Sequence, residues 1–213
     1  MFGAATLCAA YFVRGVAGFG SGLIAIPLLA LMLPLSVVVP LVVLLDYVAS
    51  ASHGLKDRAQ IQWRQIWPLL PFSAIGVLCG LYLFKTIDPV MLAHGLGVFI
   101  LFYALYTLLV KDSGGSASTL WAIPAGSLGG LIGTLFGTGG PFYVAYLKHR
   151  GLPKTQFRAT FATIFLMDGA GRLSGYMASG YFDRDWLALT AVSLPMMALG
   201  LYMGGHIHKI GRA

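Results

Sequence analysis

The stretch VRGVAGFGSGLIAIPLLALMLP, residues 13–34, decides the architecture that we predict for this chain. An apolar segment ends at Arg14, and a second, shorter apolar run resumes later and closes at Pro34. Four glycines interrupt the apolar sequence between them, namely Gly15, Gly18, Gly20 and Gly22. Glycine disfavours a helix interior because it loses the most backbone freedom on folding. The pattern therefore predicts a helix that breaks inside an apolar segment.

A related break recurs in the other half of the chain, in GSLGGLIGTLFGTGGP, residues 126–141. Interrupted apolar segments in corresponding positions of two halves are typical of the binding site of a secondary transporter. Half-helix N-termini there would direct free N–H groups and a partial positive charge at an anion. Other glycines recur four residues apart, and for these we expect close helix packing instead: Gly76/Gly80, Gly129/Gly133, Gly171/Gly175 and Gly200/Gly204.

The composition places the chain in a membrane. Of its 213 residues, 58% are hydrophobic and only 10% are charged, and glutamate is absent. A soluble domain carries about 25% charged residues. The net charge of +7 comes from basic residues in short connections, a pattern that indicates membrane topology and not nucleic-acid binding. Neither a nucleophile–base pair nor a metal-ligand spacing is present, so we expect no enzyme activity, no cofactor and no metal.

We predict an all-α polytopic bundle of two inverted repeats, each opening with a glycine-broken, re-entrant helix. Residues 1–110 form the first repeat, 111–119 a Gly/Ser-rich linker and 120–213 the second repeat. Crossing the hydrocarbon takes about 20 apolar residues, so the pieces 2–13 and 23–33 reach only part of the way. The second broken segment lies at 120–147, and the expected spans are 36–53, 66–84, 91–109, 159–179 and 187–205. We expect the second repeat to lack its last helix.

The basic connections set the orientation that we predict. Residues 54–65 and 148–158 are both basic and are expected on the inner side. This holds only if the second broken segment enters the membrane and returns to the same side. The acidic turn at 180–186 then lies outside and the basic tail inside, so the two halves are inverted relative to each other.

Four charged residues lie within or beside the apolar segments. Arg14 either lines an anion pathway or reaches the membrane interface with its long side chain. Asp168 and Arg172 are four apart and share a helix face, so they either neutralise each other or are separated by substrate or a proton. Asp46 has no adjacent base in the sequence, so it is either a proton carrier or hydrogen-bonded to nearby backbone.

These considerations define the predicted site. Asp46 and Asp168 are the candidates for proton coupling. The predicted substrate-binding residues are Arg14, Gly18, Gly20, Ser21, Gly22, Gly137, Thr138, Gly139, Gly140, Pro141 and Arg172.

Three stretches resemble the sulfite exporter TauE/SafE family, also called the toluene-sulfonate uptake permease family. They are GVAGFGSGLIAIPLL (15–29), GGLIGTLFGTGGPFYVAYL (129–147) and GLPKTQFRAT (151–160), and the resemblance in segment order covers nearly the whole chain. It implies an anion carrier of the cytoplasmic membrane, with substrates such as sulfite, sulfonates and related organosulfur acids. The chain departs from the family pattern in lacking the final hydrophobic segment and in having Asp46 where an uncharged polar residue is expected.

We therefore predict a multi-pass secondary carrier of the bacterial inner membrane. Its expected partners are a small anion, such as sulfite or a sulfonate, and the lipid bilayer, with a homodimer as one possible assembly. An anion channel on the same fold is one alternative. A non-transporting membrane subunit of a larger complex is another, because small residues suited to helix–helix contacts are abundant.

Overall fold

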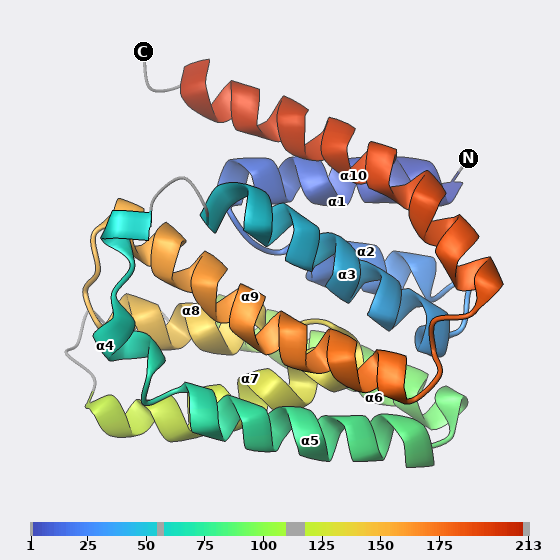
Figure 1. Ribbon diagram of the computed structural model, residues 1–213, viewed down its shortest axis with the longest axis horizontal. Coiled ribbons are helices and arrows are strands. Elements are labelled where there is room, and N and C mark those ends of the chain that lie inside the picture. Colours follow the sequence, from blue (N-terminus) through green and yellow to red (C-terminus); the bar gives the residue numbers. More distant parts are fainter. Residues whose placement is uncertain (1, 55–57, 110–117, 211–213) are drawn as a thin grey trace.

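The computed structural model describes residues 2–54, 58–109 and 118–210, and all regular structure in these ranges is helical (Figure 1). The predicted all-α fold is confirmed. Ten α-helices and two short 3₁₀ turns follow one another in the described ranges: α1 (Phe2–Ala17), α2 (Ser21–Leu29), α3 (Leu35–Gly54), η1 (Arg58–Gln60), α4 (Trp63–Ile66), α5 (Leu70–Thr86), α6 (Pro89–Leu109), η2 (Thr119–Trp121), α7 (Ala122–Phe136), α8 (Gly140–His149), α9 (Lys154–Ala178) and α10 (Arg184–Ile210).

Both predicted helix breaks are present, and each is shorter than expected. The first occupies only residues 18–20, where Gly18 and Gly20 adopt φ angles of 90° and 99° that side chains rarely tolerate. The expectation that Gly15 belongs to the break is wrong. It lies inside α1, where a Cβ would come within 2.8 Å of the Leu201 carbonyl oxygen on α10, so its role is close packing.

The second break occupies residues 137–139 and begins at Gly137, which ends α7 with φ of 62°. The other glycines of that segment, from Gly126 to Gly133, remain helical within α7. Gly126 and Gly130 allow α7 to approach the backbone of α5. Glycines in this segment therefore have two roles. Those within α7 allow close helix packing, and Gly137, with its positive φ angle, ends the helix.

The five expected spans correspond to α3, α5, α6, α9 and α10. Among the described residues, three helical stretches are long and apolar enough to cross a membrane. Two of them, 89–109 and 184–206, belong to expected spans, and the third, 119–136, lies in the segment that was expected to break and re-enter. The start of α5 differs from the prediction, because residues 63–66 form the separate short helix α4 and Pro71 lies in the first turn of α5. The linker expected at 111–119 falls largely outside the described residues.

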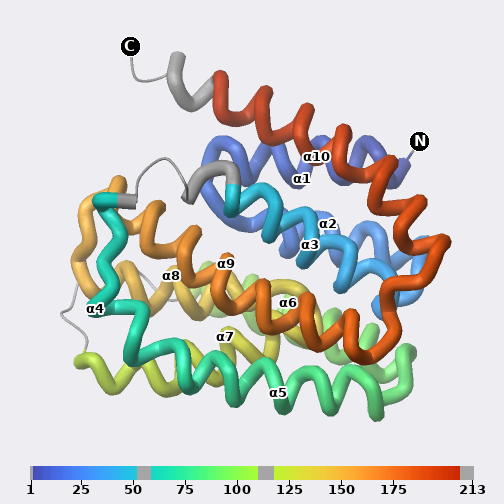
Figure 2. Tube along the Cα trace, in the orientation of Figure 1, coloured from blue at the N-terminus to red at the C-terminus, as the bar shows by residue number. Residues whose placement is uncertain are grey.

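Helices of the two halves of the chain are interleaved. Helix α1 packs against α10, and α7 packs against α5, while α3 and α9 contact each other between these pairs (Figures 1 and 2). Gly200 and Gly204 meet the backbone of α1, and Gly76 meets that of α7, as the packing interpretation predicts. Gly171 has no neighbour within 4 Å of an added Cβ, so that interpretation is wrong for this residue.

Each broken segment folds back on itself. A Cβ added to Gly3, near the start of α1, would lie 3.5 Å from the side chain of Leu29 at the end of α2. In the second half, the ring of Trp121 before α7 stacks on that of His149 at the end of α8, with centroids 6.4 Å apart. Both broken segments are therefore helical hairpins with their breaks at the tip.

Candidate functional site

The two breaks meet at the centre of the molecule. A Cβ added to Gly22 would lie 2.7 Å from the carbonyl oxygen of Gly137, so only glycine permits this approach. Between the breaks lies a central cavity of about 20 Å³. It is lined by Arg14, Phe19, Gly20, Gly22, Leu23, Asp46, Gly137, Thr138, Gly140, Pro141, Phe161 and Phe165. Seven of the eleven predicted binding residues are in this set.

Two helix N-termini open onto the central cavity. The first turns of α2 and α8 supply part of its wall, and neither helix has a side chain that caps its N-terminus. Uncapped N-termini carry unsatisfied N–H groups and a partial positive charge. The hydroxyl of Thr138, which is 2% exposed, has no hydrogen-bond partner. A buried donor group without a partner costs about 1–3 kcal/mol, so a polar ligand at this position would be favoured.

Arg14 and Asp46 form a buried ion pair beside the central cavity, with Nη1 of Arg14 2.6 Å from Oδ1 of Asp46. The same carboxylate oxygen accepts hydrogen bonds from the hydroxyls of Tyr11 and Ser21, both at 2.7 Å. Arg14 also donates to the hydroxyls of Ser21 and Ser50, at 2.9 and 2.7 Å, and to the Asp46 carbonyl oxygen at 3.1 Å.

This network corrects two of the alternatives raised from the sequence. Asp46 is not a carboxylate without a basic partner, because Arg14 reaches it from another helix. Arg14 does not extend to the membrane interface, since it is 6% exposed and its guanidinium lies 5.8 Å from the centre of the Phe165 ring.

Arg172 and Asp168 form the second buried ion pair, both from α9, as their spacing predicts. Asp168 accepts a hydrogen bond from the Ser73 hydroxyl at 2.6 Å, and that hydroxyl lies 3.2 Å from the hydroxyl of Tyr143. Arg172 also donates to the Gly129 carbonyl oxygen at 3.3 Å, while its Nε has no partner.

The two ion pairs occupy related positions. Arg14 lies four residues before the first positive-φ glycine, Gly18, and Gly133 lies four residues before Gly137. A Cβ at Gly133 would overlap the guanidinium of Arg172. In the first half, the guanidinium near the break belongs to Arg14 of the broken helix itself. In the second half, it belongs to Arg172 of α9 and occupies the space beside Gly133.

The second ion pair also reaches the breaks. Arg172 and Asp46 both line a smaller cavity of about 10 Å³, together with Gly137 and residues of α3 and α9. The remaining predicted residues lie around these cavities. Ser21 belongs to the Arg14 network, and Gly139 faces the Gly129 carbonyl of α7 rather than the central cavity.

A wider cavity of about 100 Å³ leads away from the centre on the side where α3 ends and α9 begins. Arg14, Gly18, Ser50 and Arg158 line it, with small and apolar residues of α3, α9 and α10. Arg14 thus faces both this cavity and the central one. The sequence indicated Arg158 only as one charge of a basic connection. Ser50 could have been predicted as a site residue, because it lies four residues after Asp46 and therefore on the same helix face.

Tyr11, Ser73 and Tyr143 were not predicted from the sequence at all. Each is a single polar group in an apolar helix, and nothing local distinguishes it from other tyrosines and serines. In the part of the chain that the structure describes, no three His, Cys, Asp or Glu side chains come together as metal ligands do.

The sequence of the chain is similar to those of known membrane transport proteins. The family model described as "Sulfite exporter TauE/SafE" matches residues 2–213. A protein of Comamonas testosteroni, "Probable inner membrane transporter protein TsaS", is 31% identical over 175 residues, which are 79% of this chain and 72% of that protein. No solved structure matches the chain.

Proposed function

The chain belongs to the sulfite exporter TauE/SafE family and is a transporter of the inner membrane, not an enzyme, and we propose that it is a secondary carrier of a small anion. The anion would bind where the two breaks meet. The chemistry of the central cavity favours an anion, and the family name favours a sulfur oxyanion or a small sulfonate.

The observation that carries this proposal is the convergence of three anion-attracting features on one cavity. The N-termini of α2 and α8 open onto it without side-chain caps, and the Thr138 hydroxyl beside it is buried and unpartnered. Arg14 lies in the same wall, and its positive charge becomes available to an anion when its ion pair with Asp46 separates. Anions bind helix N-termini through N–H groups and the helix dipole, and a nearby guanidinium strengthens that attraction.

We propose that the two hairpins are re-entrant and enter the membrane from opposite sides. The start of α1 lies beside the end of α2, and Trp121 before α7 lies against His149 at the end of α8, which supports the return of each hairpin to the side from which it enters. The placement of the hairpins on opposite sides follows from the basic connections. The two halves, 1–110 and 120–213, would then be inverted repeats with their breaks at mid-membrane. If α1 corresponds to α7 and α5 corresponds to α10, a two-fold relation between the halves turns the contact of α1 with α10 into that of α7 with α5. Both contacts are present, which supports this relation.

The central cavity is too small for a sulfur oxyanion in this conformation. A volume of about 20 Å³ accommodates on the order of one water molecule, so a sulfur oxyanion binds only after the helices around the breaks separate. A bound anion would compete with Asp46 for Arg14, and protonation of Asp46 would release the guanidinium to the anion. Asp168 offers the same chemistry to Arg172. Protonation of either aspartate would therefore couple anion binding to the uptake of a proton.

Counterflow of radiolabelled sulfite in proteoliposomes tests the proposal. The parent protein should show saturable uptake that is accelerated by unlabelled sulfite on the opposite side, whereas a channel would show neither property. The variant Arg14→Gln/Asp46→Asn removes both charges of the pair together and should abolish uptake. Lys154→Gln, which removes an exposed charge at the start of α9, serves as the control and should retain it. Unchanged uptake by the double variant would refute the role of Arg14.

A further inference from the structure

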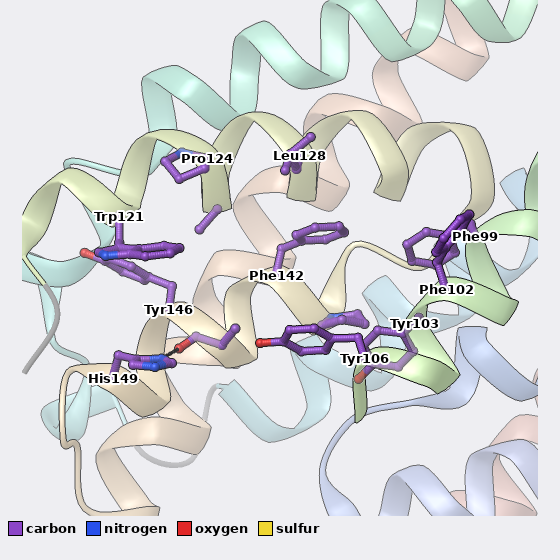
Figure 3. A pocket seen from close by; sticks show the side chains of 13 residues that line it. Phe99, Phe102, Tyr103, Tyr106, Trp121, Pro124, Leu128, Phe142, Tyr146 and His149 are labelled. Carbon is purple, nitrogen blue, oxygen red and sulfur yellow. Dashed lines mark hydrogen bonds between the residues drawn. The ribbon is translucent and has the colours of Figure 1, made fainter. Parts of the chain in front are cut away.

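A groove of about 510 Å³ lies between α6, α7 and α8 (Figure 3). Cavities of about 300–1,000 Å³ are the size that takes a small organic ligand. The walls are apolar and rich in aromatic rings, among them Phe99, Phe102, Tyr106, Trp121, Phe142 and Tyr146. Helix α6, which forms one wall, is apolar and mostly exposed along its length, so in a membrane this face is available to lipid.

The two ends of the groove differ in polarity. Figure 3 shows Trp121, Tyr146 and His149 together at one end and Phe99 and Phe102 at the other, with Phe142 between them. The Tyr146 hydroxyl donates to Gln65 at 3.3 Å. Nδ1 of His149 lies 2.7 Å from the Ala145 carbonyl oxygen, and its ring stacks on Trp121. The groove therefore has one polar end, held in place by hydrogen bonds and stacking, and one mainly apolar end, where Tyr103 stacks on Phe99.

The polar end coincides with a concentration of positive charge. Lys148 and His149 form the last turn of α8 and are exposed, and Arg150 follows them. They begin the basic connection 148–158 that the charge distribution places on the inner side of the membrane. Tryptophan and tyrosine beside basic residues are typical of the membrane interface, and the inner leaflet carries anionic lipids that attract lysine and arginine.

We infer that the groove binds an acyl chain of an anionic phospholipid, with the headgroup beside Lys148 and His149. The ligand needs one long apolar part for the aromatic walls and one anionic end for the basic turn of α8. A phospholipid of the inner leaflet has both in the required order. The inference rests on the membrane location of the chain and does not require the proposed anion site, so the two can fail separately.

Quenching of tryptophan fluorescence by brominated lipids tests the inference on the full chain in bilayers. The chain has four tryptophans. The background Trp63→Phe/Trp67→Phe removes two exposed ones and leaves Trp121, 60% exposed in the groove, and Trp186, 3% exposed as an internal reference. Brominated phosphatidylglycerol is compared with brominated phosphatidylcholine of the same chains. Phosphatidylglycerol should reach half-maximal quenching at a mole fraction about fivefold lower.

Three variants in this background separate the parts of the inference. Lys148→Gln leaves the stacking of His149 on Trp121 in place, and it should abolish the preference for phosphatidylglycerol without changing quenching by phosphatidylcholine. Ala145→Leu places a larger side chain in the groove and should weaken quenching by both lipids. Lys154→Gln removes a nearby exposed charge outside the groove and should retain the preference.

Three outcomes would overturn the inference. Equal quenching by the two lipids would show that the headgroup is not recognised. A loss of preference in Lys154→Gln as large as that in Lys148→Gln would show a general surface-charge effect. Trp121 shielded from both lipids would show that another protein surface, such as a second copy of the chain, covers the groove.

Discussion

Replacement of Asp46 by asparagine is the most informative perturbation of the central ion pair. Asp46 is 5% exposed, and its Oδ1 accepts from Arg14, Tyr11 and Ser21 at 2.6–2.7 Å. The change keeps the shape and one acceptor oxygen but leaves the guanidinium of Arg14 buried without a counter-charge. Breaking a buried pair costs about 3–5 kcal/mol, whereas hydrogen bonds between membrane helices average about 0.6 kcal/mol. The charge therefore dominates, and we expect a loss of about 3 kcal/mol.

Ser21→Ala is the matched control for this prediction. It removes one of the three donors to Asp46 and one acceptor of Arg14 but leaves both charges in place. Its expected cost is about 0.6–1.7 kcal/mol, the range measured for interhelical hydrogen bonds in membranes. The ratio between the two variants thus reports whether charge compensation or hydrogen bonding holds α1, α2 and α3 together.

A double-mutant cycle measures the coupling directly. The free energy of unfolding is obtained from titration of mixed micelles with dodecyl sulfate, followed by tryptophan fluorescence, for Arg14→Gln, Asp46→Asn and the two combined. Contacting residues couple by about 0.5–3 kcal/mol, and we expect the double variant to be at least about 1.5 kcal/mol more stable than additivity predicts. Additive effects, or a cost for Asp46→Asn no larger than that of Ser21→Ala, would refute the reasoning.

Three further substitutions test the rest of the site. Thr138→Val removes a buried hydroxyl that has no partner, so stability should not fall and should rise by up to about 1–3 kcal/mol, while the apparent sulfite KM rises several-fold. Gly133→Ala places a methyl group where the Arg172 guanidinium lies, so uptake and the melting temperature should both fall, with a destabilisation of about 1–3 kcal/mol. Gly22→Ala forces the two breaks apart at Gly137, and sulfite should then no longer raise the melting temperature.

Each of these predictions has an outcome that contradicts it. A loss of more than about 2 kcal/mol in Thr138→Val would mean that the hydroxyl has a structural partner. A Gly133→Ala protein with normal stability would show that the guanidinium of Arg172 lies elsewhere. Sulfite stabilisation that survives in Gly22→Ala would place the anion away from the breaks. Thermal shift with sulfite and with chloride, on purified protein, provides the readout for the last case.

The membrane class, the helical fold and the positions of the two breaks were predictable from the sequence, because each depends on local properties. Apolar length decides whether a helix can span the hydrocarbon, and glycine alone supplies the positive φ angles found at Gly18, Gly20 and Gly137. The pair Asp168/Arg172 was predictable for the same reason, since a spacing of four places both side chains on one helix face.

Only the tertiary structure decided which distant residues share a site. Arg14 and Asp46 lie 32 residues apart on different helices, and their pairing requires α1 and α3 to place these two side chains beside each other. Gly15 lies within α1, where it permits the close packing of α10. The absence of a side chain at Gly133 leaves the space that the guanidinium of Arg172 occupies. The sequence determined where the chain can break and what can cross the membrane, because these are local properties. The structure determined which charges neutralise each other, because that depends on helix packing.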